Sequence, residues 1–324
     1  MYYIGVDLGG TNIAVGIVNE SFSIVEKGSV PTKADRDPEL IIKDMADLCG
    51  RLIHKNNIPL EQVAYVGIAS PGIADIDRGL IVYTNNIPFH NFPIAEIFKK
   101  YLPVSNVYVA NDANAAAMGE AIAGAAKGAK NSVMITLGTG VGGGVIIDGK
   151  IFTGFNMAGA ELGHTVIAHN GRSCSCGRRG CFEAYSSATA LVKMTEEKVN
   201  QCNILSIPTL MNDEIAANNG RINARIAFNA MKKGDPVAKE LIDTYIEYLA
   251  CGITNMINIF QPEILSIGGG ISNEKEWLLE PLNKIVDRHQ YSRDCDNKCK
   301  VVIAQLGNDA GIIGAACLGQ QFRA

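Results

Sequence analysis

The stretch Tyr2-Tyr3-Ile4-Gly5-Val6-Asp7-Leu8-Gly9-Gly10-Thr11-Asn12 begins with a short apolar segment and ends with an acid, two glycines and two polar residues. The apolar segment predicts a buried strand over residues 2–8, and the two glycines predict a turn directly after it. Ile13, Val15 and Ile17 then recur at every second position, which is typical of a strand and not of a helix. This part of the chain therefore predicts two neighbouring strands joined by a glycine turn.

The residues of this turn favour a phosphate-binding role. Gly9 and Gly10 let backbone N–H groups approach a phosphate, because no Cβ stands in the way. Asp7 at the strand end could hold Mg²⁺ directly or through water, and Thr11 and Asn12 add hydroxyl and amide donors. An ordinary hairpin turn would use the same residues, so the turn alone leaves both interpretations open.

The same pattern returns in the second half of the chain. Residues 132–137 predict a strand, residues 138–144 a glycine turn and residues 145–147 a returning strand. Gly138 follows Gly9 by 129 positions (138 − 9), which indicates two related α/β halves. The turn contains a literal G-x-G-x-x-G, but a dinucleotide-binding fingerprint requires a helix after the glycines, and here a strand is expected. We therefore interpret Gly138, Thr139 and Gly140 as part of a second phosphate-binding turn.

A third glycine cluster, Gly268-Gly269-Gly270, follows a predicted strand over residues 264–267 and precedes Ser272, a candidate helix N-cap. Close backbone approach at these glycines would suit a flat nucleotide base or ribose. A simple strand-to-helix turn is the alternative.

The remaining pattern predicts an α/β chain with two domains. Asp37 and Asp235, each followed by a proline, mark helix starts, and the second helix is expected to reach about Phe260. Residues from Gly307 onward predict a terminal helix that returns to the first domain. We expect a small N-terminal α/β domain made of residues 1–118 plus 306–324, and a larger α/β domain made of residues 119–305.

Composition and charge exclude several classes of protein. The chain has 324 residues, of which 47% are hydrophobic and 19% charged, and this composition excludes a disordered protein. The formal net charge of −4 argues against a nucleic-acid partner. No apolar run approaches the ~20 residues that span a bilayer, and the first residues lack the pattern of a signal peptide. We therefore expect no membrane association and a cytoplasmic location.

Asn111 and Asp112 stand where a predicted buried strand, residues 107–110, gives way to an alanine-rich helix. In an open α/β sheet this end of a strand is the usual ligand-binding edge. A carboxylate there can accept a proton from a substrate hydroxyl, which is worth roughly 10²–10⁴ in rate. Asp112 could instead only cap the helix, but two phosphate-type turns call for a phosphoryl acceptor and favour the general-base interpretation.

One histidine and three clustered cysteines predict a zinc site. Cys174, Cys176 and Cys181 have the spacing C-x-C-x₄-C, and the first of them follows His164 by ten residues. A disulfide would leave one cysteine over, whereas Cys₃His is a closed, structural zinc set. The other six cysteines lack a comparable pattern and are expected to be buried or free thiols.

Two acids flank this segment, Glu161 before it and Glu183 after it. Two carboxylates beside an imidazole can hydrogen-bond several hydroxyls at once, which is what a polyol presents. Zinc on one ring nitrogen of His164 would leave the other nitrogen as a donor toward such a ligand. Surface charge is the alternative explanation for both acids.

The combination of these motifs resembles the ROK family of sugar kinases and repressors. The resemblance rests on the order of five segments in the chain: residues 7–12, 111–116, 137–144, 161–164 and the Cys-x-Cys-Gly-x-x-Gly-Cys-x-Glu run of residues 174–183. It implies the actin-like ATPase (ribonuclease H-like) fold with two related α/β domains around a cleft. It also implies ATP with Mg²⁺, a structural zinc and a homodimer.

The resemblance also implies a role for each matching residue. Asp112 would be the base that activates a sugar hydroxyl. Hydroxyl binding would fall to six positions: Gly72, Asn86, Asn111, Glu161, His164 and Glu183. The phosphates and the metal would be surrounded by residues of the first two turns: Asp7, Gly9, Gly10, Thr11, Asn12, Gly138, Thr139 and Gly140. The adenosine would meet Gly268, Gly269 and Gly270, and the zinc ligands would be His164, Cys174, Cys176 and Cys181.

The expected activity is ATP-dependent phosphorylation of a hexose at its 6-hydroxyl. The segment 161–164 and the zinc segment are most similar to those of bacterial glucokinases of the family, which makes D-glucose the first expectation. A kinase of N-acetylmannosamine, N-acetylglucosamine or another hexose is the alternative within the class, and a sugar-sensing regulator without turnover is the alternative outside it. Repressors of the family carry a DNA-binding helix-turn-helix before the first glycine motif, whereas here that motif starts at Asp7.

Overall fold

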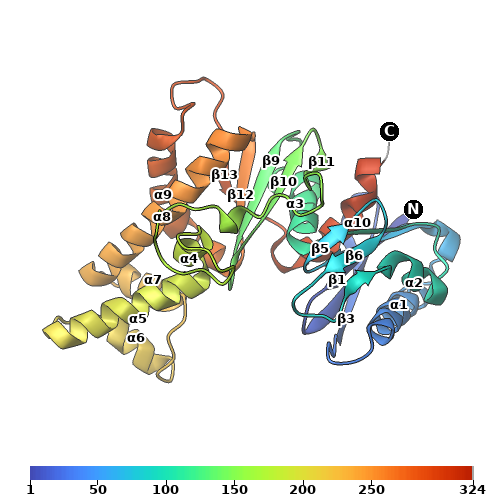
Figure 1. Cartoon of the computed structure of the whole chain (residues 1–324), viewed down its shortest axis with the longest axis horizontal. Coiled ribbons are helices and arrows are strands. Elements are labelled where there is room, and N and C mark those ends of the chain that lie inside the picture. Colours follow the sequence, from blue (N-terminus) through green and yellow to red (C-terminus); the bar gives the residue numbers. More distant parts are fainter. Residues whose placement is uncertain (323–324) are drawn as a thin grey trace. The chain divides into compact units, whose positions relative to one another are not determined.

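The computed structural model describes residues 1–322 and forms an α/β protein with two compact units (Figure 1). Unit 1 contains residues 1–134, 144–160 and those from 304 onward, and unit 2 contains residues 135–143 and 161–303. The sequence predicts domain boundaries at 118/119 and 305/306. These boundaries remain a prediction. None of the helices within residues 1–322 is long and apolar enough to cross a bilayer.

The main sheet of unit 1 has five strands in the order β3-β2-β1-β4-β8. Their bounds are β1 (Tyr2–Leu8), β2 (Asn12–Val18), β3 (Ile24–Pro31), β4 (Val63–Ser70) and β8 (Val107–Asn111). The β1–β2 hairpin is antiparallel, as predicted, whereas β1, β4 and β8 run parallel to one another. In the register, Asp7 pairs with Ala69 and Ser70 pairs with Asn111. The carboxyl ends of three strands therefore meet at one edge and bring Asp7 and Asn111 to it.

Two helices cover one part of this sheet, α1 (Pro38–Lys55) and α2 (Ile94–Tyr101). The predicted start of α1 is confirmed, because the Asp37 side chain accepts a hydrogen bond from Glu39 N and Pro38 is the first helical residue. A small antiparallel sheet with the order β5-β6-β7 was not expected from the sequence. Its short strands are β5 (Ile73–Asp75), β6 (Leu80–Tyr83) and β7 (His90–Phe92), and a 3-10 turn, η1 (Leu60–Gln62), precedes β4.

The terminal helix α10 (Ala310–Cys317) returns to unit 1 and packs against β1, β4 and α3 (Asp112–Ala123). Glycines make this close packing possible, since a Cβ on Gly5 would overlap the carbonyl oxygen of Ile312 and one on Gly67 that of Ala315. Tyr65 Oη also donates a hydrogen bond to Ala316 O at 2.6 Å. The predicted terminal helix is present, although its first turn is 3-10, η4 (Gly307–Asp309), and η5 (Leu318–Phe322) follows it.

The second five-stranded sheet has the order β11-β10-β9-β12-β13. Its strands are β9 (Ser132–Leu137), β10 (Val141–Ile147), β11 (Lys150–Ile151), β12 (Ile264–Gly268) and β13 (Lys300–Ile303). The predicted glycine turn over residues 138–144 is too long, because β10 already begins at Val141. Gly143 and Gly144 instead allow close packing against neighbouring side chains. A Cβ on Gly143 would lie 2.7 Å from Leu162 Cδ1, and a Cβ on Gly144 would lie 2.5 Å from Ala117 Cβ.

Unit 2 adds six α-helices to its strands: α4 (Glu183–Ser186), α5 (Ala188–Leu205), α6 (Met211–Ala217), α7 (Arg225–Lys232), α8 (Pro236–Phe260) and α9 (Glu276–His289). The bounds of α8 are those predicted, and its buried Tyr245 donates a hydrogen bond to Ser186 O at 2.7 Å. The expectation that Ser272 caps a helix is wrong. Ser272 lies inside the 3-10 turn η3 (Gly270–Glu274), where its hydroxyl donates to Gly269 O, and α9 begins only at Glu276.

Candidate functional site

The acidic edge of unit 1 is organised by Asn111, the last residue of β8. Its Oδ1 accepts hydrogen bonds from Ala113 N at 2.9 Å and Asn114 N at 3.2 Å, so Asn111 is the N-cap of α3. Its Nδ2 donates to Gly72 O at 3.0 Å, which brings these two predicted sugar-binding residues together. Gly72 has φ +86°, and a Cβ there would overlap Tyr83 O, so only glycine fits. Asp112 is thus the first helical residue, and the capping position belongs to its neighbour.

Asp112 and Asp7 are carboxylates whose proton affinity is raised. Burial raises the pKa of Asp7 to about 6, and the negative charge of Asp112 adds to this effect. Burial also raises the pKa of Asp112, partly offset by a hydrogen bond from Ala113 N at 2.8 Å, although the residue keeps a solvent-exposed surface. Among the described residues neither acid forms an ion pair. Two nearby acids without a cationic partner fit a divalent cation that takes oxygen ligands.

The first glycine turn is fixed from both sides. Gly9 N donates to Asn12 O at 2.9 Å, and the Thr32 hydroxyl donates to Gly9 O at 2.6 Å. Gly10, Thr11 and Asn12 are exposed. A Cβ on Gly10 would lie 3.4 Å from Asn86 Cβ, so the predicted sugar-binding residue Asn86 lies beside the first glycine turn. The sequence did not single out Thr32, which lies far from the turn in the chain.

The second glycine turn is held by the start of α5 and by Glu183. Ala188 N donates to Gly138 O at 2.8 Å, and the Thr189 hydroxyl donates to Thr139 O at 2.7 Å. Glu183 Oε2 accepts from Val141 N at 3.0 Å and occupies the space that a Cβ on Gly140 would need. Thr189 is a further residue that sequence reasoning missed, because nothing in its local sequence distinguishes it from an ordinary helical threonine.

The third glycine cluster lies beside the second turn. Gly269 has φ +83°, and a Cβ on it would lie 2.5 Å from Leu137 O, at the end of β9. β9 and β12 are neighbours in the sheet, so the residues that follow them, Gly138 and Gly269, come to the same edge. The sequence predicted both glycine clusters but could not show that they are adjacent.

His164, Cys174, Cys176 and Cys181 form a compact cluster, here called the His/Cys cluster. Their ligand atoms all lie within 4.8 Å of one another. Cys176 Sγ is 3.7 Å from Cys181 Sγ, and Cys174 Sγ is 3.6 Å from His164 Nδ1. Tetrahedral zinc with Zn–S bonds of ~2.3 Å and Zn–N bonds of ~2.0 Å separates its ligand atoms by about 3.5–3.8 Å. The donor set and its spacing therefore fit zinc, with Nδ1 as the histidine atom that faces it.

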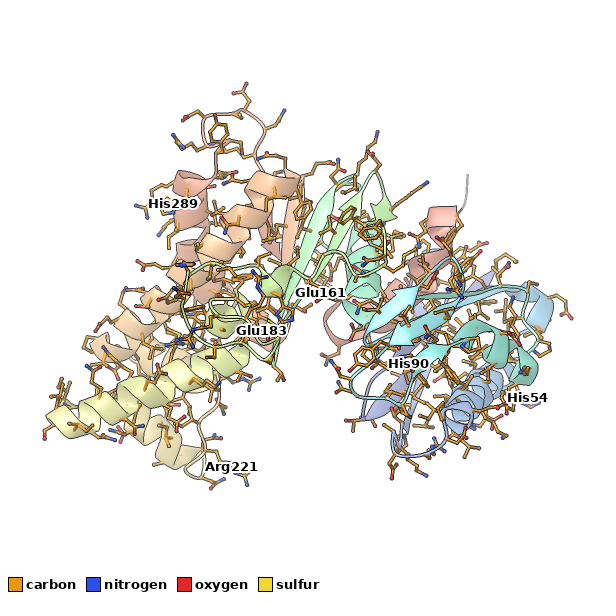
Figure 2. All side chains as sticks on the ribbon, in the orientation of Figure 1. His54, His90, Glu161, Glu183, Arg221 and His289 are labelled. Carbon is orange, nitrogen blue, oxygen red and sulfur yellow. The ribbon has the colours of Figure 1, made fainter. Side chains whose placement is uncertain are left out.

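The two acids around the cluster, both labelled in Figure 2, differ in their exposure and in their partners. Glu161 is exposed, and its carbonyl accepts from His164 N at 3.1 Å in the 3-10 turn η2 (Leu162–His164). Glu183 is half-buried, and its Oε1 accepts from the Ser175 hydroxyl at 3.2 Å and the Cys174 thiol at 3.7 Å. Simple surface charge therefore does not describe Glu183. The other four histidines are all exposed, and none of them belongs to the cluster: His54, His90, His169 and His289.

Comparison with known proteins gives the family. The ROK family model matches residues 3–322. A glucokinase of Thermotoga maritima is 38% identical over 317 residues, which is 97% of this chain and 96% of that protein. A glucokinase of Halalkalibacterium halodurans is 35% identical over 321 residues, which is 99% of this chain and 95% of that protein.

A solved structure agrees over the same length. A ROK family glucokinase from Streptomyces griseus, in complex with glucose and AMPPNP, is 32% identical and has a TM-score of 0.79. The match covers 99% of this chain and 100% of that one. The predicted fold class, an α/β protein of the actin-like ATPase type, is thereby confirmed. On this full-length agreement in sequence and fold, the chain belongs to the ROK family.

Proposed function

We propose that this protein is an ATP-dependent hexose kinase that transfers a phosphoryl group to the 6-hydroxyl of a hexose, with D-glucose as the first substrate. The observation that carries the proposal is the position of Asp112. Asn111 caps α3, and Asp112 stands at the helix start with a raised pKa, which suits a general base. The similarity to glucokinases over the whole chain supports the same activity.

In this reaction Asp112 accepts the proton of the sugar hydroxyl while that oxygen forms a bond to the γ-phosphorus. The bond between the γ-phosphorus and the bridging oxygen breaks, and ADP leaves with the electron pair. A carboxylate with a raised pKa is a stronger base than an exposed aspartate, which favours the proton transfer.

The glycine turns of both units contribute backbone N–H groups to the phosphates. In unit 1 the first turn, Gly9 to Asn12, would surround the phosphates, and in unit 2 Gly138, Thr139 and Gly140 would do so. The N–H groups of Gly9 and Gly138 are used within their own turns, by Asn12 O and Gly140 O, so the donors would come from the other residues of the turns. Asp7 would hold Mg²⁺, which when bound neutralises charge on the phosphate oxygens. Gly268 to Gly270 would adjoin the adenosine, because a turn without side chains accepts a flat ring.

Sugar hydroxyls would be bound by Gly72, Asn86 and Asn111 of unit 1 and by Glu161, His164 and Glu183 of unit 2. Asn111 is already oriented by its bonds to α3 and to Gly72 O. His164 presents Nδ1 to the His/Cys cluster, so Nε2 is the atom available to a hydroxyl.

The His/Cys cluster would hold a structural zinc ion. Four protein ligands leave no position for water, so the metal would order residues 161–183 rather than take part in the chemistry. A homodimer in the cytoplasm, which the family resemblance implies, is part of the same proposal.

Release of ADP from ATP in the presence of a panel of hexoses tests the proposed function directly. We expect turnover with D-glucose and the highest kcat/KM for it. A higher kcat/KM for N-acetylmannosamine or N-acetylglucosamine than for D-glucose would assign the N-acetylated hexosamine as the substrate instead. Binding of a hexose without ADP release from any member of the panel would replace the kinase by a sugar-sensing regulator.

A further inference from the structure

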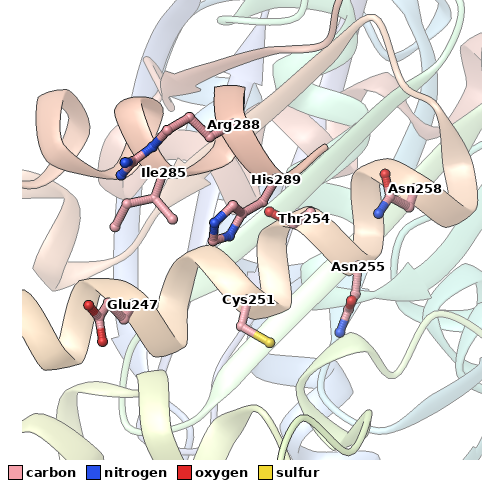
Figure 3. A pocket seen from close by; sticks show the side chains of 8 residues that line it. All are labelled: Glu247, Cys251, Thr254, Asn255, Asn258, Ile285, Arg288 and His289. Carbon is pink, nitrogen blue, oxygen red and sulfur yellow. The ribbon is translucent and has the colours of Figure 1, made fainter. Parts of the chain in front are cut away.

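A pocket whose lining residues are mostly polar lies between α8 and α9 of unit 2 (Figure 3). Its volume is about 690 Å³, which falls in the range of ~300–1,000 Å³ typical of pockets that bind small molecules. α8 lines it with five side chains: Glu247, Cys251, Thr254, Asn255 and Asn258. None of them belongs to the residues assigned above to the kinase reaction, so the pocket is a separate feature.

Thr254 gives the first reason to expect a ligand. It is only 7% exposed, and its hydroxyl has no hydrogen-bond partner among the described residues. A helical threonine normally donates to the carbonyl one turn earlier. Thr195 does so, at 2.8 Å from Leu191 O, and Thr244 on α8 itself does so, at 3.0 Å from Glu240 O. Thr254 departs from this pattern and lines the pocket, and a buried hydroxyl of this kind calls for a partner.

The second reason is that hydrogen-bond donors gather in the pocket. Asn258 Oδ1 is occupied by Tyr291 N at 2.9 Å, so its amide N–H groups are what it can offer to a ligand. On α9, Arg288 uses Nε to bond Lys284 O at 3.1 Å and forms no ion pair within residues 1–322. Its two terminal nitrogens are suited to bind an oxyanion in bidentate fashion. His289 stands next to it at the end of the helix (Figure 3).

We propose that this pocket binds a small phosphate monoester of a polyol. Arg288 and His289 would bind the phosphate oxygens, and the amides of Asn255 and Asn258 with the Thr254 hydroxyl would bind the hydroxyl groups. Glu247, the one carboxylate in the lining, accepts hydrogen bonds from hydroxyls but repels a purely anionic ligand. A phosphate alone leaves the amide side of the pocket without partners, and a neutral sugar leaves Arg288 without one.

The thiol of Cys251 allows this site to be probed in the intact protein. Cys251 lines the pocket and is exposed, whereas Cys295 is an exposed thiol outside the lining. We expect a saturating hexose 6-phosphate to slow alkylation of Cys251 by about tenfold, measured by mass spectrometry, while Cys295 reacts at an unchanged rate. Free hexose and inorganic phosphate, tested separately, are expected to protect Cys251 much less.

Three results of this alkylation experiment with the wild-type protein would overturn the proposal. The first is a Cys251 that does not react even without ligand, because the pocket would then be covered. The second is a reactive Cys251 that no hexose phosphate protects. The third is equal protection by inorganic phosphate, which would make the site one for a simple anion and remove the polyol.

Variants distinguish a loss of ligand binding in this pocket from a general loss of folded structure. Arg288→Gln should weaken protection about tenfold, as expected for a lost charged hydrogen bond, and Arg221→Gln, an equal charge change elsewhere in unit 2, should not. Thr254→Val should weaken protection yet leave the unligated protein at least as heat-stable, because it removes an unpartnered buried hydroxyl. Unchanged protection in both pocket variants would contradict the proposal. Alkylation of Cys251 reports on the pocket alone and needs no turnover, so the test of this site does not depend on the kinase activity.

Discussion

Glu183 Oε2 accepts a hydrogen bond from the backbone N–H of Val141 at 3.0 Å, and this bond joins the segment of the His/Cys cluster to the second glycine turn. The other oxygen of the same carboxylate accepts from the Ser175 hydroxyl at 3.2 Å. One side chain therefore touches both a segment proposed to bind sugar and a turn proposed to bind phosphate. Its removal should disturb both sites at once.

Glu183→Ala is accordingly expected to raise the KM for the sugar and the KM for ATP, each by about tenfold, the effect of a lost charged hydrogen bond. Glu161→Ala is the matched control, because Glu161 is exposed and lies outside the turn. It should raise only the KM for the sugar. Steady-state kinetics with each substrate varied in turn makes the comparison, and an unchanged KM for ATP in Glu183→Ala would refute the link.

Asp112→Asn keeps the shape of the side chain but removes the base. We expect kcat to fall by roughly 10²–10⁴ while sugar affinity stays within a few-fold of the wild type. Equilibrium titration with sugar, together with the ADP-release assay, separates the two effects. Asp77→Asn, a change of an exposed acid in unit 1, should leave both unchanged. Retained turnover in Asp112→Asn would take the base role away from this residue.

Elemental analysis of the purified protein should find about one zinc ion per chain, as a Cys₃His site requires. Cys176→Ser should lower the zinc content, the midpoint of thermal unfolding and the sugar affinity together, because the metal orders the surrounding segment. Cys295→Ser, at an exposed thiol outside the His/Cys cluster, is the control and should change none of the three. A full zinc content in Cys176→Ser would show that the ligand set is different.

Asp235 makes stability depend on pH. Burial raises its pKa, but hydrogen bonds from the Thr209 hydroxyl and from the backbone N–H groups of residues 210, 237 and 238 outweigh burial and hold the pKa below its usual value. The native state thus holds this proton less tightly than the unfolded state, whose pKa is 3.8. The stabilisation from Asp235 is complete above pH 3.8 and is lost as the pH falls through the native pKa.

Asp235→Asn should therefore lower the free energy of unfolding by about 1–3 kcal/mol at pH 7, because one backbone donor would face the new amide group. The difference from the wild type should shrink as the pH falls below 3.8. Urea unfolding at a series of pH values measures it. Asp296→Asn, at an exposed loop residue, should show no such dependence, and a constant difference in Asp235→Asn would contradict the assignment.

Glu120 is a buried carboxylate with backbone partners in two distant segments. Oε1 accepts from Leu306 N at 2.8 Å, and Oε2 accepts from Ala125 N at 2.7 Å and Gln305 N at 3.1 Å. Glutamine offers a single acceptor oxygen, so Glu120→Gln would leave at least one buried N–H unpaired. We expect a loss of about 2–3 kcal/mol in the free energy of unfolding, measured by urea titration. The exposed Glu61→Gln is the control, and equal stability of both variants would contradict the role.

The regular elements of the fold were largely predictable because their signals are local. A short apolar segment defined β1, alternating apolar residues defined β2, and an aspartate followed by proline defined the starts of α1 and α8. The sheet β5-β6-β7 was not predictable, since strands of three or four residues carry too little periodicity. Ser272 and the glycines of β10 were misinterpreted because their sequence resembles a cap and a turn, whereas tertiary packing decides their conformation.

The candidate site divides in the same way. Residue types and spacing pointed to the His/Cys cluster, and the structure brings its four ligand atoms together. Sequence could not decide whether Asp112 is only a cap, because Asn111 stands next to it and either side chain could serve. The contacts of Glu183 with Val141 and of Thr189 with Thr139 join residues that are 42 and 50 positions apart, and no local pattern encodes such pairs.

The return of α10 to unit 1 has a consequence for folding during synthesis on the ribosome. Gly5 and Gly67 lack side chains, so α10 can lie directly on β1 and β4 and cover that face of the sheet. While the first 134 residues emerge during translation, that face of the sheet is bare and apolar. Unit 1 can complete its core only after residue 317 has left the exit tunnel, whereas residues 161–303 of unit 2 emerge earlier. Residues 1–134 are therefore made before residues 161–303 of unit 2 but complete their packing after them.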